Sequence, residues 1–190
     1  MKIKDLIVES AKTKYAALLF KLNDNDPGDP DVINCSKVSS LKDIDFAGLK
    51  KNIGLYMHGN SSIKNLDGGP KVLNGTLFVE ECDNFESLSG TIEEVYPHET
   101  FIEAINIDGC PKLKSLKDIH KHFKVIKGEF SCSSDIESNV LGLLKIKGLT
   151  KVWFPNQQAC KIINKYLPEG DILECQDELI DANLSDFAKL

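Results

Sequence analysis

The predicted fold rests on one stretch of sequence, Ile105-Asn-Ile-Asp-Gly-Cys-Pro-Lys-Leu-Lys-Ser-Leu116. Counted from its first residue, apolar side chains stand at places one, three, nine and twelve, and a cysteine stands at place six. The same spacing recurs in the stretches that begin at Leu55 and Leu77. Such a period predicts chain segments that stack side by side to bury one shared apolar face. Three weaker copies have place six at Cys35, Ser133 and Asn156.

Each copy predicts a short strand over places one to four, followed by a bend at place six. Side chains alternate between the two faces of a strand, so odd places should point into the core and even places outward. In the weaker copies this numbering puts Phe130 and Trp153 inward. The segments that return to the next strand predict short helices over residues 41–53 and 116–126 and a longer helix over 157–167. The outward residues of the weaker copies are Asp31, Ile33, Glu129, Ser131, Val152 and Phe154.

One continuous domain of the α/β class is predicted. Residues 1–29 should form an N-terminal cap, with a helix over about residues 3–21 and then a polar loop, because apolar residues from Leu6 to Leu19 follow helical spacing. Residues 30–170 hold about six copies of the pattern. Residues 171–190 should add a last strand over 171–174 and a capping helix over 181–190.

Composition and charge exclude several classes of protein. The net charge is -6 and all 23 basic residues are lysine, so the clustered cations and arginine forks that bind nucleic acid are missing. No apolar run is long enough to span a membrane and no secretory leader is apparent, which favours the cytoplasm. We therefore expect reduced thiols. Four of them should form a buried column in successive segments: Cys35, Cys82, Cys110 and Cys175.

The spacing apolar-x-apolar-x-x-Asn/Cys-x-x-apolar-x-x-Leu resembles the leucine-rich repeat. The resemblance covers residues 30–165 and implies a short solenoid, with parallel strands on one face, short helices and turns on the other, and helical caps. The stretch from Leu66 to Gly75 and the run from Ile162 to Cys175 also resemble divergent repeats of uncharacterised phage and bacterial proteins. That narrower resemblance implies a phage-encoded protein acting in a bacterial cytoplasm.

Leucine-rich repeat proteins mostly bind other proteins through their sheet. The resemblance therefore implies a non-enzymatic protein-protein interaction module, and its phage character implies an inhibitor of a host protein such as a defence protein. Aromatic residues flanked by carboxylates suit a partner with a basic patch and apolar pockets. A second candidate site is the insertion over residues 93–101. The predicted partner-binding residues are Tyr56, His58, Phe78, Glu80, Asn106, Asp108 and Phe154.

No cofactor, metal or catalytic group is predicted. His120 and His122 would diverge on a helix, since residues two apart lie about 200° apart around the axis. The polar loop around Asp24, Asp26 and Asp29 lacks the spacing of a calcium loop. Direct nucleic-acid binding and membrane association are not expected, and the oligomeric state stays open. Two alternatives also remain open: an acidic nucleic-acid mimic that blocks a DNA-binding protein, and an enzyme with an unrecognised site.

Overall fold

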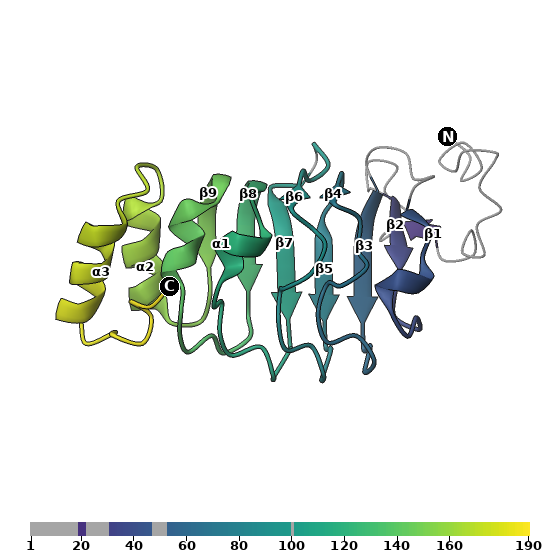
Figure 1. The fold of residues 1–190 in the computed structure, drawn as a ribbon, viewed down its shortest axis with the longest axis horizontal. Helices are drawn as coiled ribbons and strands as arrows, with labels where there is room; N and C mark the ends of the chain where they lie inside the picture. Colours follow the sequence, from purple (N-terminus) through teal and green to yellow (C-terminus); the bar gives the residue numbers. More distant parts are fainter. Residues whose placement is uncertain (1–18, 22–30, 47–52, 100) are drawn as a thin grey trace.

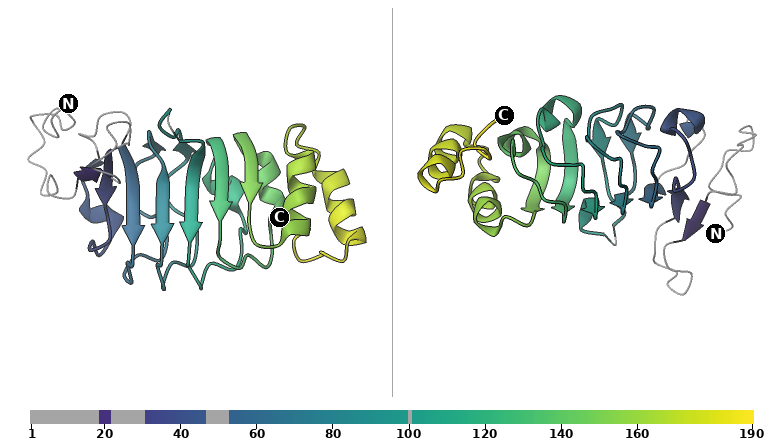
Figure 2. Two further views of the ribbon diagram at one scale, coloured as in Figure 1. Left: turned by 180° about the vertical axis from the view of Figure 1, so that it is seen from behind. Right: turned by 90° about the horizontal axis from the view of Figure 1, so that it is seen from below.

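The computed structural model describes residues 19–21, 31–46, 53–99 and 101–190, and these form an α/β fold. A mostly parallel, open sheet runs along the molecule, and two longer helices close its C-terminal end (Figure 1). The short helix α1 lies in front of the sheet in Figure 1. In the view turned by 180°, the strands lie in front (Figure 2, left). The predicted α/β class with parallel strands is thus confirmed.

The strands are short and follow one another with turns between them. The sheet order runs β2-β3-β5-β7-β8, with β9 also paired to β8 and β1 joined antiparallel to β2. A second, shorter parallel ladder joins β4, β6 and the beginning of β8. The strands are β1 (Leu19–Lys21), β2 (Asp31–Asn34), β3 (Ile53–His58), β4 (Val72–Leu73), β5 (Leu77–Glu80), β6 (Glu94–Val95), β7 (Glu103–Asp108), β8 (Val125–Cys132) and β9 (Lys147–Trp153). The helices are η3 (Leu41–Asp43), α1 (Ile119–His122), η5 (Leu141–Lys145), α2 (Gln157–Tyr166) and α3 (Ile172–Asp181).

The three strongest copies of the sequence pattern have the predicted register. Leu55 pairs with Leu77, and Leu77 pairs with Ile105, so residues at place one lie side by side. Places one and three of these copies are fully buried in one continuous apolar core. The bend before β5 packs closely on β3 because Gly75 has no side chain, as a Cβ there would lie 2.3 Å from the backbone nitrogen of Gly54.

The three weaker copies have a different register from the predicted one. Ile33 pairs with Leu55, so Ile33 is a core residue and not an outward one. Phe130 pairs with Ile105 and takes place one, where we expected place three. Trp153 pairs with the outward Ser131 and therefore also points outward. Phe154 points into the core and has no exposed surface.

The helices differ from prediction mainly after residue 170. The helix predicted over residues 157–167 is confirmed by α2. The strand predicted over 171–174 is wrong, because Asp171 caps α3 by accepting a hydrogen bond from the Glu174 nitrogen, and α3 buries Cys175 and Leu179 one turn apart. The capping helix predicted over 181–190 is also wrong, since α3 ends at Asp181 and only turns follow.

Shorter helices than predicted fill two return segments. Residues 41–43 and 119–122 are helical, and β8 already begins at Val125. The predicted N-terminal helix and polar loop lie outside the described residues, except that residues 19–21 form a strand and Asp31 begins β2.

The C-terminal edge of the sheet is closed by one amide. Asn164 of α2 accepts a hydrogen bond from the Val152 nitrogen (2.8 Å) and donates one to the Val152 oxygen (2.8 Å). These are the backbone groups that a further strand would pair with. After α3 the chain returns to the sheet, and Phe187 stacks on Phe154 with ring centroids 6.3 Å apart.

All six cysteines are free and buried, but the predicted column of four does not form. Cys82 and Cys110 occupy place six of neighbouring segments. Cys35 takes place three of its segment, because Ile33 takes place one, and Cys175 lies on α3. Burial raises the pKa of the Cys35 thiol to about 12, so this thiol is protonated at neutral pH.

Candidate interaction surface

The sheet has one face that is not packed against the core, which we call the outer face. It carries the side chains at places two and four, which point away from the core because the odd places point into it. Paired residues of consecutive strands align these side chains in rows. The second-place row reads Asn34, Tyr56, Phe78, Asn106, Ser131 and Trp153, and the fourth-place row includes His58, Glu80 and Asp108.

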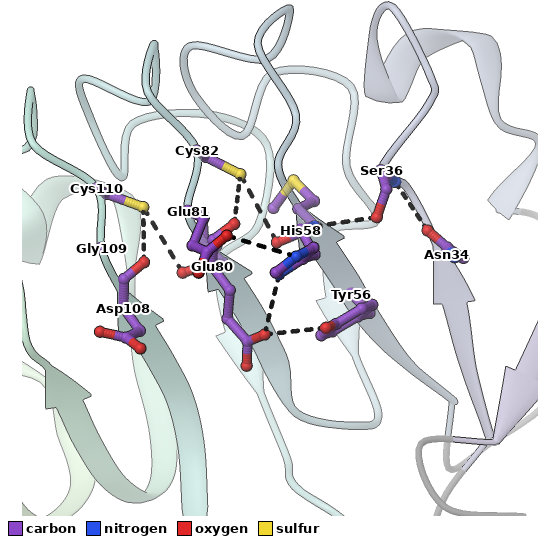
Figure 3. Close-up of polar contacts among 12 residues, drawn as sticks. Asn34, Ser36, Tyr56, His58, Glu80, Glu81, Cys82, Asp108, Gly109 and Cys110 are labelled. Carbon is purple, nitrogen blue, oxygen red and sulfur yellow. Dashed lines mark hydrogen bonds and ion pairs between the residues drawn. The ribbon is translucent and has the colours of Figure 1, made fainter.

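The N-terminal part of the outer face is an aromatic and acidic cluster (Figure 3). The Tyr56 hydroxyl donates to Glu80 Oε2 (2.9 Å), and the Tyr56 and His58 rings stack with centroids 6.1 Å apart. The two His58 ring nitrogens lie 3.5 Å from Glu80 Oε2 and 3.6 Å from Glu81 Oε2. Glu81 reaches this position through a left-handed backbone turn after β5, with φ of 51°.

Tyr56 is held as a hydrogen-bond donor in this cluster. Burial, together with the hydrogen bond to Glu80, raises the pKa of Tyr56 to about 12. The phenol therefore keeps its proton at neutral pH. The His58 backbone is positioned from the other side, because its nitrogen donates to Ser36 Oγ (3.1 Å).

Phe78 lies on the outer face but is covered. Its ring meets Tyr56 edge-on at 6.2 Å and Phe101 edge-on at 6.0 Å, and only 6% of the residue is exposed. Phe101 belongs to the insertion over residues 93–101, so the two sites predicted as separate candidates meet at Phe78. The half-buried Phe101 and not Phe78 is the aromatic surface available there.

The middle of the outer face carries short polar side chains between carboxylates. A bulge buries Ala104 and leaves Glu103 beside Asn106, whose Nδ2 donates to Glu103 Oε2 (3.0 Å). On the other flank, Asp108 is exposed and accepts a hydrogen bond from the Ser133 hydroxyl. Neither carboxylate forms an ion pair with a residue that the structure describes.

The C-terminal end of the outer face presents Trp153. Its side chain is the last of the second-place row and the residue is 45% exposed. Lys151 lies beside it and pairs with Glu129 (3.3 Å). The sequence pattern missed this residue, because Trp153 and Phe154 are adjacent apolar residues and the numbering assigned the wrong one to the core.

The structure thus brings six of the seven predicted partner-binding residues onto one face. Tyr56, His58, Glu80, Asn106 and Asp108 are accessible there, and Phe78 supports them from beneath Phe101. The expectation that Phe154 faces outward is wrong. No group of three or more potential metal-ligating side chains occurs among the described residues, and no helix among them is long and apolar enough to cross a membrane.

Comparisons with protein-family models, with curated proteins and with solved structures found no match to this chain.

Proposed function

We propose that the chain is a non-enzymatic protein-binding module that recognises its partner with the outer face. The observation that supports this most directly is the part of the second-place row that runs from Tyr56 past Asn106 and Ser131 to the exposed Trp153. Exposed aromatic residues among polar and acidic ones are typical of interaction surfaces, where large rings contribute most of the affinity. The sheet beneath them is a rigid support because its other face is fully buried.

We also propose that the stacked segments form a leucine-rich-repeat-like solenoid. The parallel pairing of Leu55, Leu77 and Ile105 supports it, and so do isolated parallel bridges outside the strands, between Leu66 and Gly90 and between Ser115 and Ser138. Asn60 supports it as well, because its amide links two neighbouring segments at place six. The further proposal of a phage-encoded inhibitor of a host protein rests on the sequence resemblance alone.

A site-specific cross-linking experiment tests the binding function. A photo-reactive phenylalanine analogue replaces Ser131 in the outer face or, as a control, the exposed Lys117, which lies in a turn outside the strands. We expect one cross-linked protein from a lysate of the source organism with the Ser131 variant, none with the Lys117 variant, and loss of the product after Tyr56→Ala. Equal cross-linking at both positions would contradict the proposed site.

A further inference from the structure

We propose that the outer face receives one α-helix of the partner protein, lying across the strands, with one apolar side chain on Trp153, another beside Tyr56 and a cationic side chain between them. This inference rests on the proposed function and specifies the chemistry of the partner.

The positions of the two aromatic residues give the length of the contact. Four steps between hydrogen-bonded strands separate Tyr56 from Trp153 in the second-place row. Parallel strands lie about 4.8 Å apart, so the two rings are separated by roughly 19 Å. The positions between them are Phe78, which Phe101 covers, and the short side chains of Asn106 and Ser131, so Tyr56 and Trp153 are the two accessible rings that the row itself offers.

The charges between the anchors select a cation. Glu103, Asp108 and Glu129 flank the middle of the row on its two sides. Lys151 is the one lysine paired to them among the described residues, and it lies at the Trp153 end, 3.3 Å from Glu129. Among the described residues, the carboxylates of Glu103 and Asp108 accept hydrogen bonds only from the neutral Asn106 and Ser133 side chains. A partner lysine or arginine at this position would complement two carboxylates that form no ion pair within the described part of the chain.

A helix fits this face better than an extended peptide does. An extended peptide needs the free backbone groups of an edge strand to pair with. At one edge Asn164 occupies both backbone groups of Val152, and at the other the edge strand β1 is only three residues long (Leu19–Lys21). The outer face itself offers side chains, and a helix can lie on side chains because its own backbone groups are already paired.

Helix geometry then predicts the partner's sequence pattern. A rise of about 1.5 Å per residue covers roughly 19 Å in about 13 residues. Positions i, i+7 and i+14 lie within about 40° of one another around the axis, and i+14 lies about 21 Å from i. The partner helix should therefore carry apolar residues at i and i+14 and a lysine or arginine at i+7.

Trp153 provides the measurement, because it is the only tryptophan in the sequence. Three helical peptides without tryptophan or tyrosine serve as probes. The first has leucine at i and i+14 with lysine at i+7, the second has the same composition with leucines at i and i+7, and the third has glutamate in place of the central lysine. Titration is followed by the emission of Trp153, which shifts to shorter wavelength when a ligand covers the ring.

We expect the first peptide to shift the emission and to bind at least about tenfold more tightly than either other peptide, because the second loses the anchor at i+14 and the central lysine and the third loses the central ion pair. Asp108→Asn should remove most of the difference between the first and third peptides. Glu137→Gln is the matched control, since this exposed carboxylate lies away from the outer face and should change nothing.

Equal binding of the three peptides, or no emission change with the first, would overturn the helix inference. If the Ser131 cross-linking experiment still captures one partner, the proposed function stands and only the helix geometry is refuted. If cross-linking fails as well, both are refuted.

Discussion

Replacing Asn60 by alanine should strongly destabilise the fold, although Asn60 is a single polar residue. The residue is 2% exposed, and its side chain makes four hydrogen bonds. Nδ2 donates to the Cys35 oxygen (2.6 Å) and the Val38 oxygen (2.9 Å) of the preceding segment. Oδ1 accepts from the Ser62 nitrogen (2.8 Å) and the Ile63 nitrogen (2.9 Å) of its own turn.

The magnitude follows from these four contacts. A typical hydrogen bond contributes about 1 kcal/mol net, and a buried group that is left unpaired costs about 1–3 kcal/mol. Ser62 is exposed, so water can replace its bond, whereas the two carbonyl groups beneath Asn60 are buried. We therefore expect Asn60→Ala to lower the free energy of unfolding by about 3–5 kcal/mol.

Urea unfolding followed by circular dichroism measures this change. Asn60→Asp separates the two halves of the network, since it keeps the acceptor for Ser62 and Ile63 but turns a carboxylate oxygen toward two carbonyl oxygens. It should be at least as destabilising as the alanine variant at neutral pH. Asn65→Ala is the control, because Asn65 Oδ1 accepts one exposed hydrogen bond from the Asp67 nitrogen (3.0 Å), and losing it should cost at most about 1 kcal/mol. A loss below about 1 kcal/mol for Asn60→Ala would refute the reasoning.

Three further predictions test the register and the buried polar groups. Phe154→Ala should lower the free energy of unfolding by about 3–5 kcal/mol, as expected for a buried phenylalanine. Trp153→Ala should lower it much less, because Trp153 is exposed. If urea unfolding showed Trp153→Ala to be the more destabilising variant, the register predicted from sequence would be correct after all. His120 Nδ1 is buried without a hydrogen-bond partner among the described residues, and burial, with Lys145 nearby, lowers the pKa of this imidazole below 6.5. Protonation therefore favours the unfolded state, so stability should be complete above about pH 6.5 and fall below it, and unfolding curves of His120→Gln should lose this part of the pH dependence. The six thiols should react with a thiol reagent such as Ellman's reagent only as fast as the chain unfolds, because all six residues are buried; rapid reaction of the native protein would contradict this burial.

The central part of the fold could be predicted because several independent signals agree there. In the copies that begin at Leu55, Leu77 and Ile105, places one, three and nine are apolar, place four is polar, and the bend at place six has a small or amide side chain. A slip by one residue would turn the whole apolar set outward, so only one register is compatible with a buried face.

The outer copies could not be placed by the same argument. Around Phe130 the chain reads Glu-Phe-Ser-Cys, and both possible numberings bury an apolar residue. At Trp153-Phe154 two large apolar residues are adjacent, so alternation requires one of them to face out without saying which. The structure buries Phe154 because Phe187 stacks on it, a contact between residues far apart in sequence that no local pattern contains.

The candidate surface, too, could be predicted only in part. The positions of Tyr56, Glu80 and Asp108 follow from the register, because place two and place four of a correctly numbered strand face outward. The covering of Phe78 by Phe101 could not be foreseen, since it depends on the path of the insertion. The helix α3 was missed because Ile172, Cys175 and Leu179 show helical spacing only when the window extends beyond four residues.

The amide of Asn164 also determines how the architecture could change in length. The Asn164 amide takes the hydrogen bonds that one residue of a following strand would make. The position of α2 therefore determines where the sheet ends. A duplicated segment inserted before α2 would leave this closure unchanged and add one strand to the sheet. Replacing Asn164 with leucine would instead leave the Val152 nitrogen unpaired and only the Cys160 thiol on the Val152 oxygen, and an unpaired sheet edge is the feature that lets sheets of separate molecules join into filaments.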